Sequence, residues 1–197
     1  MPEENAQHLS ESQRPMTHLA RSLSAHRPDD PHEAADLRQI VEFVARHPDP
    51  FDRRIRDGHL TGSAIVVSTD GGRVLLLRHR KLQRWLQPGG HADPGERTGE
   101  AVALREALEE TGIAGLALHA KAPRPLDVDV HDIPARGEEP AHLHLDLRYL
   151  VLAPAEAALA RSPAESDDLR WFGWDELGEL DLDPGLRRAL GKARAFF

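Results

Sequence analysis

The chain has 197 residues, enough for one hydrophobic core with an appended subdomain but few for two full domains. Its formal net charge of −8 argues against binding to long nucleic acid, because such binding is driven by basic surface that displaces counterions. A small anionic substrate is compatible with this charge if a metal ion inverts the local field. The chain has no cysteine, which excludes disulfides, thiolate metal ligands and a cysteine nucleophile.

The N-terminal segment is polar and acidic, and residues 1 to 14 have the composition of a disordered tail. No stretch of the chain approaches the roughly 20 apolar residues of a membrane span. We therefore expect a cytoplasmic protein without membrane contact. Residues 1–55 are expected to form a tail and a helical extension docked on a main domain of residues 56–197.

The extension contains one helix with recognisable ends. Asp30 suits the N-cap, Pro31 the first helical position and Glu33 the third, which is a capping box. His47 and Pro48 end the helix. Its apolar residues lie at helical spacing and predict one stripe that packs on the main domain: Leu37, Ile40, Val41 and Val44.

The main domain begins with β patterns. A hairpin is predicted from SAIVVST (63–69) and RVLLLRH (73–79), joined by a turn at Asp70-Gly71-Gly72. Further strands are predicted at 126–133, 141–152 and LRWFGW (169–174), and Asp183-Pro184 opens a final amphipathic helix. Together with a central acidic helix, these elements predict an α+β fold with a mixed β-sheet sandwiched between helices.

The central helix is predicted from Glu100 to Thr111, with Gly112 at its end. At 3.6 residues per turn it carries Glu106, Glu109 and Glu110 as one carboxylate patch. Ala101, Leu104 and Leu108 fall on the opposite side and are expected to pack on the sheet. Three like charges at this spacing repel one another, and a hard divalent cation such as Mg²⁺ would offset that cost. The alternative is a solvated acidic helix face.

Two glycine turns precede this helix, Gln87-Pro88-Gly89-Gly90 and Asp93-Pro94-Gly95. The loop and helix together resemble the Nudix box, the signature of the Nudix hydrolases. The matching residues are Gly90, HADPG, Glu96, RTGEAVAL and REALEETGI (105–113). The family pattern has seven residues between the first glutamate and the arginine, whereas this chain has eight. The extra residue enlarges the loop or first turn, which bears on the role of Glu96, and leaves the register from Arg105 onwards intact.

The resemblance extends over about residues 60 to 197 and implies a Nudix fold with an N-terminal helical extension. It implies cleavage of the diphosphate linkage in a nucleoside diphosphate linked to another group, with Mg²⁺ or Mn²⁺ as cofactor. By the same resemblance, Glu106, Glu109, Glu110 and the Gly89 carbonyl would hold the metal. Arg105 would steady a box glutamate.

The general base is expected either in the box or in a downstream loop, where Glu138 and Glu139 are candidates. Their alternative role is that of solvated loop residues.

Near the metal and phosphates, the glycine loop would contribute Gly89, Gly90, Glu96 and also His91, which follows the double glycine. Polar residues alternate along the two downstream strands: Asp127, Asp129 and His131 on one, and His142, His144, Asp146 and Arg148 on the other. In an antiparallel hairpin, one register pairs His131 with His142, Asp129 with His144 and Asp127 with Asp146. This surface is either a wet outer face, or a place where His144 or Asp146 binds substrate or metal.

A second function is a nucleotide-binding sensor with the Nudix fold and no catalysis. No basic recognition helix is evident, and the box carboxylates that such a sensor would be expected to have lost are present. Residues 126–133 contain neither the proline nor the tyrosine that marks some substrate subgroups of the family, so no subgroup is assigned. The expected partner is a small nucleotide-type substrate, and a homodimer is compatible with the sequence.

Overall fold

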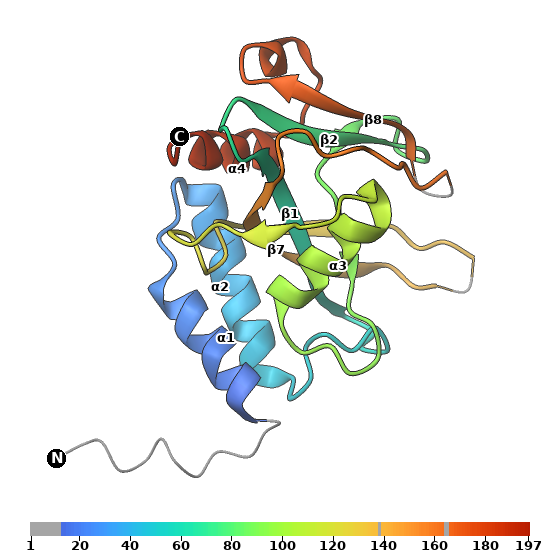
Figure 1. Cartoon of the computed structure of the whole chain (residues 1–197). Helices are drawn as coiled ribbons and strands as arrows, with labels where there is room; N and C mark the ends of the chain where they lie inside the picture. Colours follow the sequence, from blue (N-terminus) through green and yellow to red (C-terminus); the bar gives the residue numbers. More distant parts are fainter. Residues whose placement is uncertain (1–12, 138, 164–165) are drawn as a thin grey trace, which may run out of the picture.

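The computed structural model describes residues 13–137, 139–163 and 166–197 (Figure 1). Its helices are α1 (Gln13–Ala25), α2 (Pro31–Arg46), α3 (Gly99–Thr111) and α4 (Pro184–Arg194), with a 3-10 turn at Glu176–Glu179. Its strands are β1 (Gly58–Ser68), β2 (Arg73–His79), β3 (Trp85–Leu86), β4 (Gly89–His91), β5 (Ala117–Leu118), β6 (Asp127–Ile133), β7 (His142–Ala153) and β8 (Ser166–Gly173).

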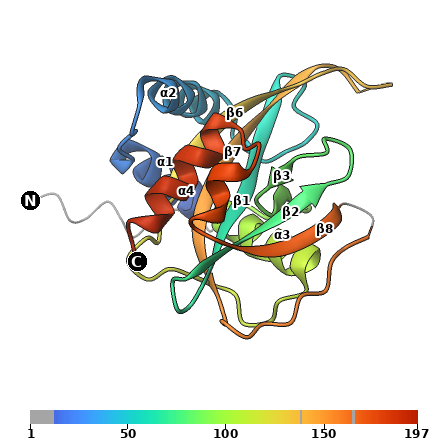
Figure 2. The ribbon, with the colours of Figure 1, turned by 90° about the horizontal axis from the view of Figure 1, so that it is seen from above.

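These strands form one mixed sheet, in which β1 is parallel to β7 and every other pairing is antiparallel. Strand alternation sends Ala64 and Val66 into a core cluster shared with α3, and Ile65 and Val67 into a second cluster shared with α4. The view from above shows α3 and α4 on either side of β1 and β7 (Figure 2). The predicted mixed sheet between helices is confirmed.

The sequence missed three short strands, β3, β4 and β5, and made β8 too short. Each missed strand has only two or three residues, too few for an alternating pattern. Among the described residues, no helix combines the length and the apolar character that crossing a membrane requires.

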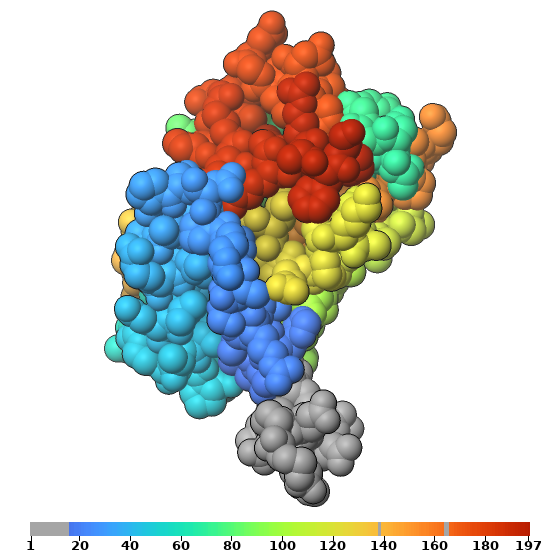
Figure 3. Space-filling model, turned by 90° about the vertical axis from the view of Figure 1, so that its left-hand side faces the viewer, coloured from blue at the N-terminus to red at the C-terminus, as the bar shows by residue number. Residues whose placement is uncertain are grey.

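The N-terminal extension contains two helices, α1 and α2, which pack against the main domain. Helix α2 contacts β6, and its Ile40 and Phe43 are buried in the cluster that also contains Leu60 of β1. The space-filling view shows these helices beside α4 on one face of the molecule (Figure 3). The predicted stripe was partly wrong, because Val41 is 43% exposed and Phe43 takes its place in the core.

The predicted tail overlaps the start of α1, which begins at Gln13. The other tail residues, 1–12, lie outside the described residues.

The capping box of α2 forms as predicted at Asp30, whose Oδ1 accepts the Glu33 N–H at 2.8 Å. The return bond from Glu33 reaches Asp29 rather than Asp30, with the Asp29 N–H donating at 2.7 Å. Glu33 is fully buried and also accepts from His26 Nε2 at 2.7 Å and from Lys192 of α4. One carboxylate therefore joins the end of α1, the start of α2 and α4.

Burial acts to raise the pKa of Glu33, but hydrogen bonds from His26 and Lys192 outweigh it and hold the pKa well below its ordinary 4.5. A carboxylate whose pKa is lower in the folded than in the unfolded chain stabilises the fold at pH values above its unfolded pKa. That stability is lost as the pH falls towards the folded pKa. We expect Glu33→Gln to lower the free energy of unfolding by about 2 kcal/mol at neutral pH. The difference in unfolding free energy between the wild type and Glu33→Gln should shrink below about pH 4.5.

Urea unfolding over a series of pH values measures this difference. Glu42→Gln, an exposed position on the same helix, is the matched control and should track the wild type throughout. A deficit of Glu33→Gln that stays constant down to acid pH would contradict the expected titration.

Candidate active site

The glycine loop is partly a strand, which the sequence did not predict. Residues Gly89, Gly90 and His91 form β4 and pair antiparallel with Ser63, Gly62 and Thr61 of β1, respectively. A Cβ at Gly62 would lie 2.5 Å from the Gly99 carbonyl oxygen at the start of α3. The bare backbone at Gly62 therefore lets α3 lie directly against β1, beside β4.

Helix α3 ends as predicted. Gly112 has φ +67° and donates its N–H to the Leu108 carbonyl at 2.8 Å, and Ile113 is buried. The predicted packing face was wrong for Ala101, which is exposed, and for Leu108, which is 48% exposed. The helix instead buries five other side chains: Val102, Ala103, Ala107, Glu110 and Thr111.

The buried side of the helix is joined to the sheet through Glu110. The Gly89 N–H donates to Glu110 Oε2 at 2.9 Å, and Glu110 is only 6% exposed. A buried carboxylate is stable only if it is paired, so the helix must turn this residue towards β4 rather than towards solvent.

The other two box glutamates lie next to this contact. A Cβ at Gly90 would be 2.6 Å from a carboxylate oxygen of Glu106, so only glycine leaves Glu106 its place against the backbone of β4. The side chain of Glu109 is more exposed, and its carboxylate lies 3.1 Å from Arg105 Nη1. The structure thus places Glu110 and Glu106 against Gly89 and Gly90, and Arg105 joins Glu109 to Glu106.

Arg105 connects the helix to the loop. Its guanidinium donates to Glu96 Oε2 at 3.0 Å and to the His91 carbonyl at 2.6 Å, and lies 3.1 Å from Glu106 Oε1. Burial acts to raise the pKa of Glu96, but hydrogen bonds from Arg105 and from the Asp93 N–H lower it overall. The extra residue in the box therefore leaves Glu96 in contact with Arg105, and Arg105 contacts carboxylates as the resemblance implied.

Strands β6 and β7 form the predicted antiparallel hairpin, but the register differs by two residues. Asp127 pairs with Arg148, Asp129 with Asp146 and His131 with His144. A slip of two residues keeps the same faces, so strand alternation could not distinguish the two registers.

The polar face of this hairpin is buried rather than wet. Asp127, Asp129, Asp146 and Arg148 are each at most 4% exposed. The Arg148 guanidinium contacts Asp127 at 3.1 Å, Asp129 at 2.7 Å and Asp146 at 3.3 Å. Arg188 of α4 adds a contact of 2.7 Å to Asp127. The wet-face prediction fails because α4 packs over these residues, with Arg188 against Asp127 and Gly185 against Asp129.

Asp146 is also fixed by β1. Its Oδ1 accepts hydrogen bonds from Thr61 Oγ1 and Ser63 Oγ, both at 2.9 Å, while Arg148 Nε donates to Oδ2 at 3.3 Å. These contacts saturate both oxygens with protein donors, so Asp146 serves here to join β1 and β7.

Four histidines from three strands meet at the end of this face: His59 of β1, His91 of β4, and His142 and His144 of β7. The Nε2 atoms of His91 and His144 are 3.0 Å apart, and those of His142 and His144 are 3.2 Å apart. Burial, followed by neighbouring positive charge on the other histidines, lowers the pKa of His59 and His144 to about 4 and that of His91 to about 3.

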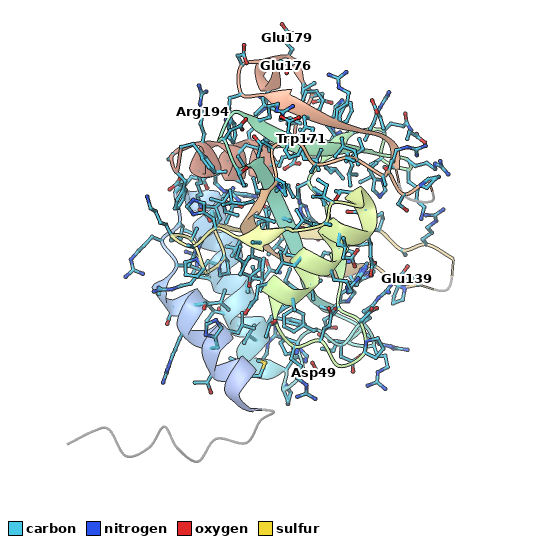
Figure 4. All side chains as sticks on the ribbon, in the orientation of Figure 1. Asp49, Glu139, Trp171, Glu176, Glu179 and Arg194 are labelled. Carbon is cyan, nitrogen blue, oxygen red and sulfur yellow. The ribbon has the colours of Figure 1, made fainter. Side chains whose placement is uncertain are left out.

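The predicted site residues therefore fall into two groups. Gly89, Gly90 and Glu96 lie with the box carboxylates, whereas the side chains of His91 and His144 lie in the histidine cluster. Glu139 is exposed on the β6–β7 loop, where its Oε1 lies 3.9 Å from His142 Nε2 (Figure 4). Glu138 lies outside the described residues.

Sequence reasoning missed His59, Thr61, Ser63 and Gln87. The first three alternate along β1, but the predicted strand began at Ser63, so this pattern was not read. Gln87 Nε2 approaches Asp146 Oδ2 at 3.5 Å from the glycine turn, and no local pattern marks it.

Comparison with known proteins identifies relatives for most of the main domain. Curated relatives include the putative 8-oxo-dGTP diphosphatase of Bacillus subtilis, 43% identical over 60 residues that cover 30% of this chain and 39% of the relative. The putative 8-oxo-dGTP diphosphatase 3 of Mycobacterium tuberculosis is 32% identical over 131 residues, 64% of this chain and 56% of the relative. The chain thus spans less than two thirds of the length of these curated relatives.

Solved structures with the same fold include an Ap4A hydrolase binary complex from C. elegans, with a TM-score of 0.55 and 21% identity over 70% of this chain and 96% of the other. A MutT NUDIX hydrolase from Burkholderia pseudomallei has a TM-score of 0.51 and 27% identity, covering 69% and 98%. The family model of the NUDIX domain matches residues 58–192, more than half of the sequence. The chain therefore belongs to the Nudix family.

Proposed function

We propose that the chain is a pyrophosphohydrolase that cleaves the diphosphate linkage of a nucleoside diphosphate joined to another group, with Mg²⁺ or Mn²⁺ as cofactor. The observation that carries this proposal is the placement of Glu110 and Glu106 against the backbone of Gly89 and Gly90, with Glu109 joined to Glu106 through Arg105. Family membership and the diphosphatases among the curated relatives support the same activity.

The residues present fit a hard divalent cation, which prefers oxygen ligands. Glu106, Glu109 and Glu110 would hold it, together with the Gly89 carbonyl. The missing side chain at Gly90 leaves Glu106 beside the β4 backbone, where a Cβ would displace its carboxylate. An ion held there would supply a water of lowered pKa and would offset charge on the phosphoryl oxygens.

The remaining box residues hold this constellation in place. Arg105 has contacts to Glu96, Glu106 and Glu109 and a hydrogen bond to the His91 carbonyl, so it fixes the helix relative to β4. Positioning of this kind accounts for a large part of phosphoryl-transfer catalysis, because little covalent chemistry is left to the protein. Glu139, on an exposed loop, is the proposed general base outside the box.

The names of the relatives suggest which compounds to test first. They include putative 8-oxo-dGTP diphosphatases and an Ap4A hydrolase, so nucleoside triphosphates and dinucleoside polyphosphates are the first compounds to test. A homodimer and a cytoplasmic location remain predictions from the sequence.

A panel of nucleoside-diphosphate compounds, including 8-oxo-dGTP and Ap4A, tests the proposal. We expect turnover of at least one compound with Mg²⁺ or Mn²⁺ and release of a nucleoside monophosphate or phosphate. Removal of the ion by EDTA should abolish turnover, and adding back Mg²⁺ should restore it. Turnover that survives full chelation would contradict the metal mechanism. Tight nucleotide binding with no turnover of any compound would instead favour the sensor.

A further inference from the structure

The histidine cluster has two unsatisfied nitrogens at its centre. His59 is 2% exposed, and neither Nδ1 nor Nε2 of its ring has a hydrogen-bond partner. Its ring centroid lies 5.0 Å from that of His91 and 4.9 Å from that of His144. A buried polar atom without a partner costs about 1–3 kcal/mol, so this arrangement needs a compensating interaction.

The protons in the cluster cannot satisfy its close contacts. His142 Nδ1 is 2.9 Å from the Pro140 carbonyl, which can only accept, so Nδ1 carries the hydrogen and Nε2 of the neutral ring has a lone pair. His144 Nε2 lies 3.2 Å from that atom and 3.0 Å from His91 Nε2. One hydrogen on His144 serves only one of these contacts well. If His91 donates to His144 instead, the Nε2 lone pair of His144 faces the Nε2 lone pair of His142.

We propose that His59, His91 and His144 bind a divalent transition metal ion of the Zn²⁺ class, at a site separate from the box carboxylates. One ring nitrogen from each of the three lies within 4.8 Å of the others. Tetrahedral zinc with metal–nitrogen bonds of about 2.0–2.1 Å places its ligand nitrogens roughly 3.3 Å apart. The 3.0 Å between His91 Nε2 and His144 Nε2 is close to that spacing.

The chemistry of the donors decides the class of metal. Imidazole nitrogens suit Zn²⁺, Cu²⁺, Fe²⁺ and Ni²⁺, whereas Mg²⁺ and Ca²⁺ prefer oxygen. The bond from His142 to Pro140 fixes the tautomer of that ring and leaves its Nε2 facing His144, so His142 is placed to support the site or to complete it.

The backbone of β4 separates this site from the box. Successive residues of a strand point to opposite faces of the sheet. A Cβ at Gly90 would point at Glu106, so the side chain of His91, the next residue, lies on the other face. Because His59, His91 and His144 come from β1, β4 and β7, a metal there would tie these three strands together. It would also fix the strand that carries Gly89.

A second group of possible ligands, His32, Asp36 and Asp129, is a weaker candidate. Asp129 is already paired with Arg148 at 2.7 Å and Arg188 at 3.4 Å, and two arginines repel a cation. His32→Ala therefore serves as a control that separates this group from the histidine cluster.

Metal binding to the full, tag-free chain tests the proposal, by equilibrium dialysis with Zn²⁺ and by the visible absorption of tetrahedral Co²⁺. Wild type, Glu110→Gln and His32→Ala should each bind one ion with similar affinity. His59→Ala and His91→Ala should bind it at least tenfold more weakly and lose the tetrahedral Co²⁺ spectrum. Added Zn²⁺ should raise the Tm of the wild type but not of His91→Ala.

His91 is only partly buried, so its alanine variant provides the test even if His59→Ala does not fold. Unchanged Zn²⁺ affinity in His91→Ala would overturn the proposal. Loss of Zn²⁺ binding in Glu110→Gln or in His32→Ala, with binding retained in the histidine-cluster variants, would also overturn it. Both results are independent of whether the chain hydrolyses a nucleotide.

Discussion

Glu110→Gln should lower kcat by at least about 100-fold, more than the 10- to 100-fold expected for a residue that only supports a ligand. The amide keeps the size of the side chain and an oxygen that can accept the Gly89 N–H, so the bond of 2.9 Å between β4 and α3 can persist. What is lost is one negative charge at the proposed metal site. Activity should therefore fall much more than stability does.

Steady-state kinetics on the best compound of the panel measures this effect, with a titration of Mg²⁺ for each variant. Glu179→Gln, an exposed glutamate far from α3 (Figure 4), is the matched control and should retain wild-type kcat. Thermal unfolding of both variants separates lost chemistry from lost structure. Wild-type turnover by a folded Glu110→Gln would exclude this carboxylate from the metal site.

Arg148→Met should cause the largest loss of stability, about 3–5 kcal/mol in the free energy of unfolding. Arg148 is fully buried and contacts Asp127, Asp129 and Asp146. Methionine fills much of the same volume but leaves the carboxylates with less positive charge in a place that water does not reach. Removing one partner of a buried ion pair is costly for this reason.

Urea unfolding at neutral pH measures the loss, and Arg54→Met is the control. Arg54 pairs with Asp52 at 2.7 Å on the surface, where solvent screens the interaction, so its replacement should leave stability unchanged. Adding Asp129→Asn to Arg148→Met should recover part of the loss, because one buried charge is then removed. A double variant less stable than Arg148→Met alone would show that Asp129 is stabilised by its other partners instead.

Helix ends were predicted well because their signals are local. Asp30 and Pro31 open α2, Asp183 and Pro184 open α4, and Gly112 closes α3, each through a bond within a few residues of the cap. The first hairpin follows from its turn in the same way, with Val66 paired to Leu75.

The spacing of the box could also be read from the sequence, because the glutamates lie on one helix. Which side of that helix is buried could not be predicted from the sequence. Ala101 and Leu108 form as apolar a side as Val102 and Ala107 do, and only contacts made across the fold, such as the bond from Gly89 to Glu110, distinguish the buried side.

The sequence by itself determined the longer strands, helices α2, α3 and α4, the mixed sheet between helices and the family, since all of these depend on residue types at short spacing. Only the tertiary structure decided what its polar residues do. The register of β6 on β7 sets which polar residues pair across the hairpin, and the parallel pairing of β1 with β7 brings together residues more than 80 positions apart, such as Thr61 and Asp146. Periodicity along one strand cannot select its partner or its register, so the buried Arg148 network and the histidine cluster around His59 emerged only from the folded chain.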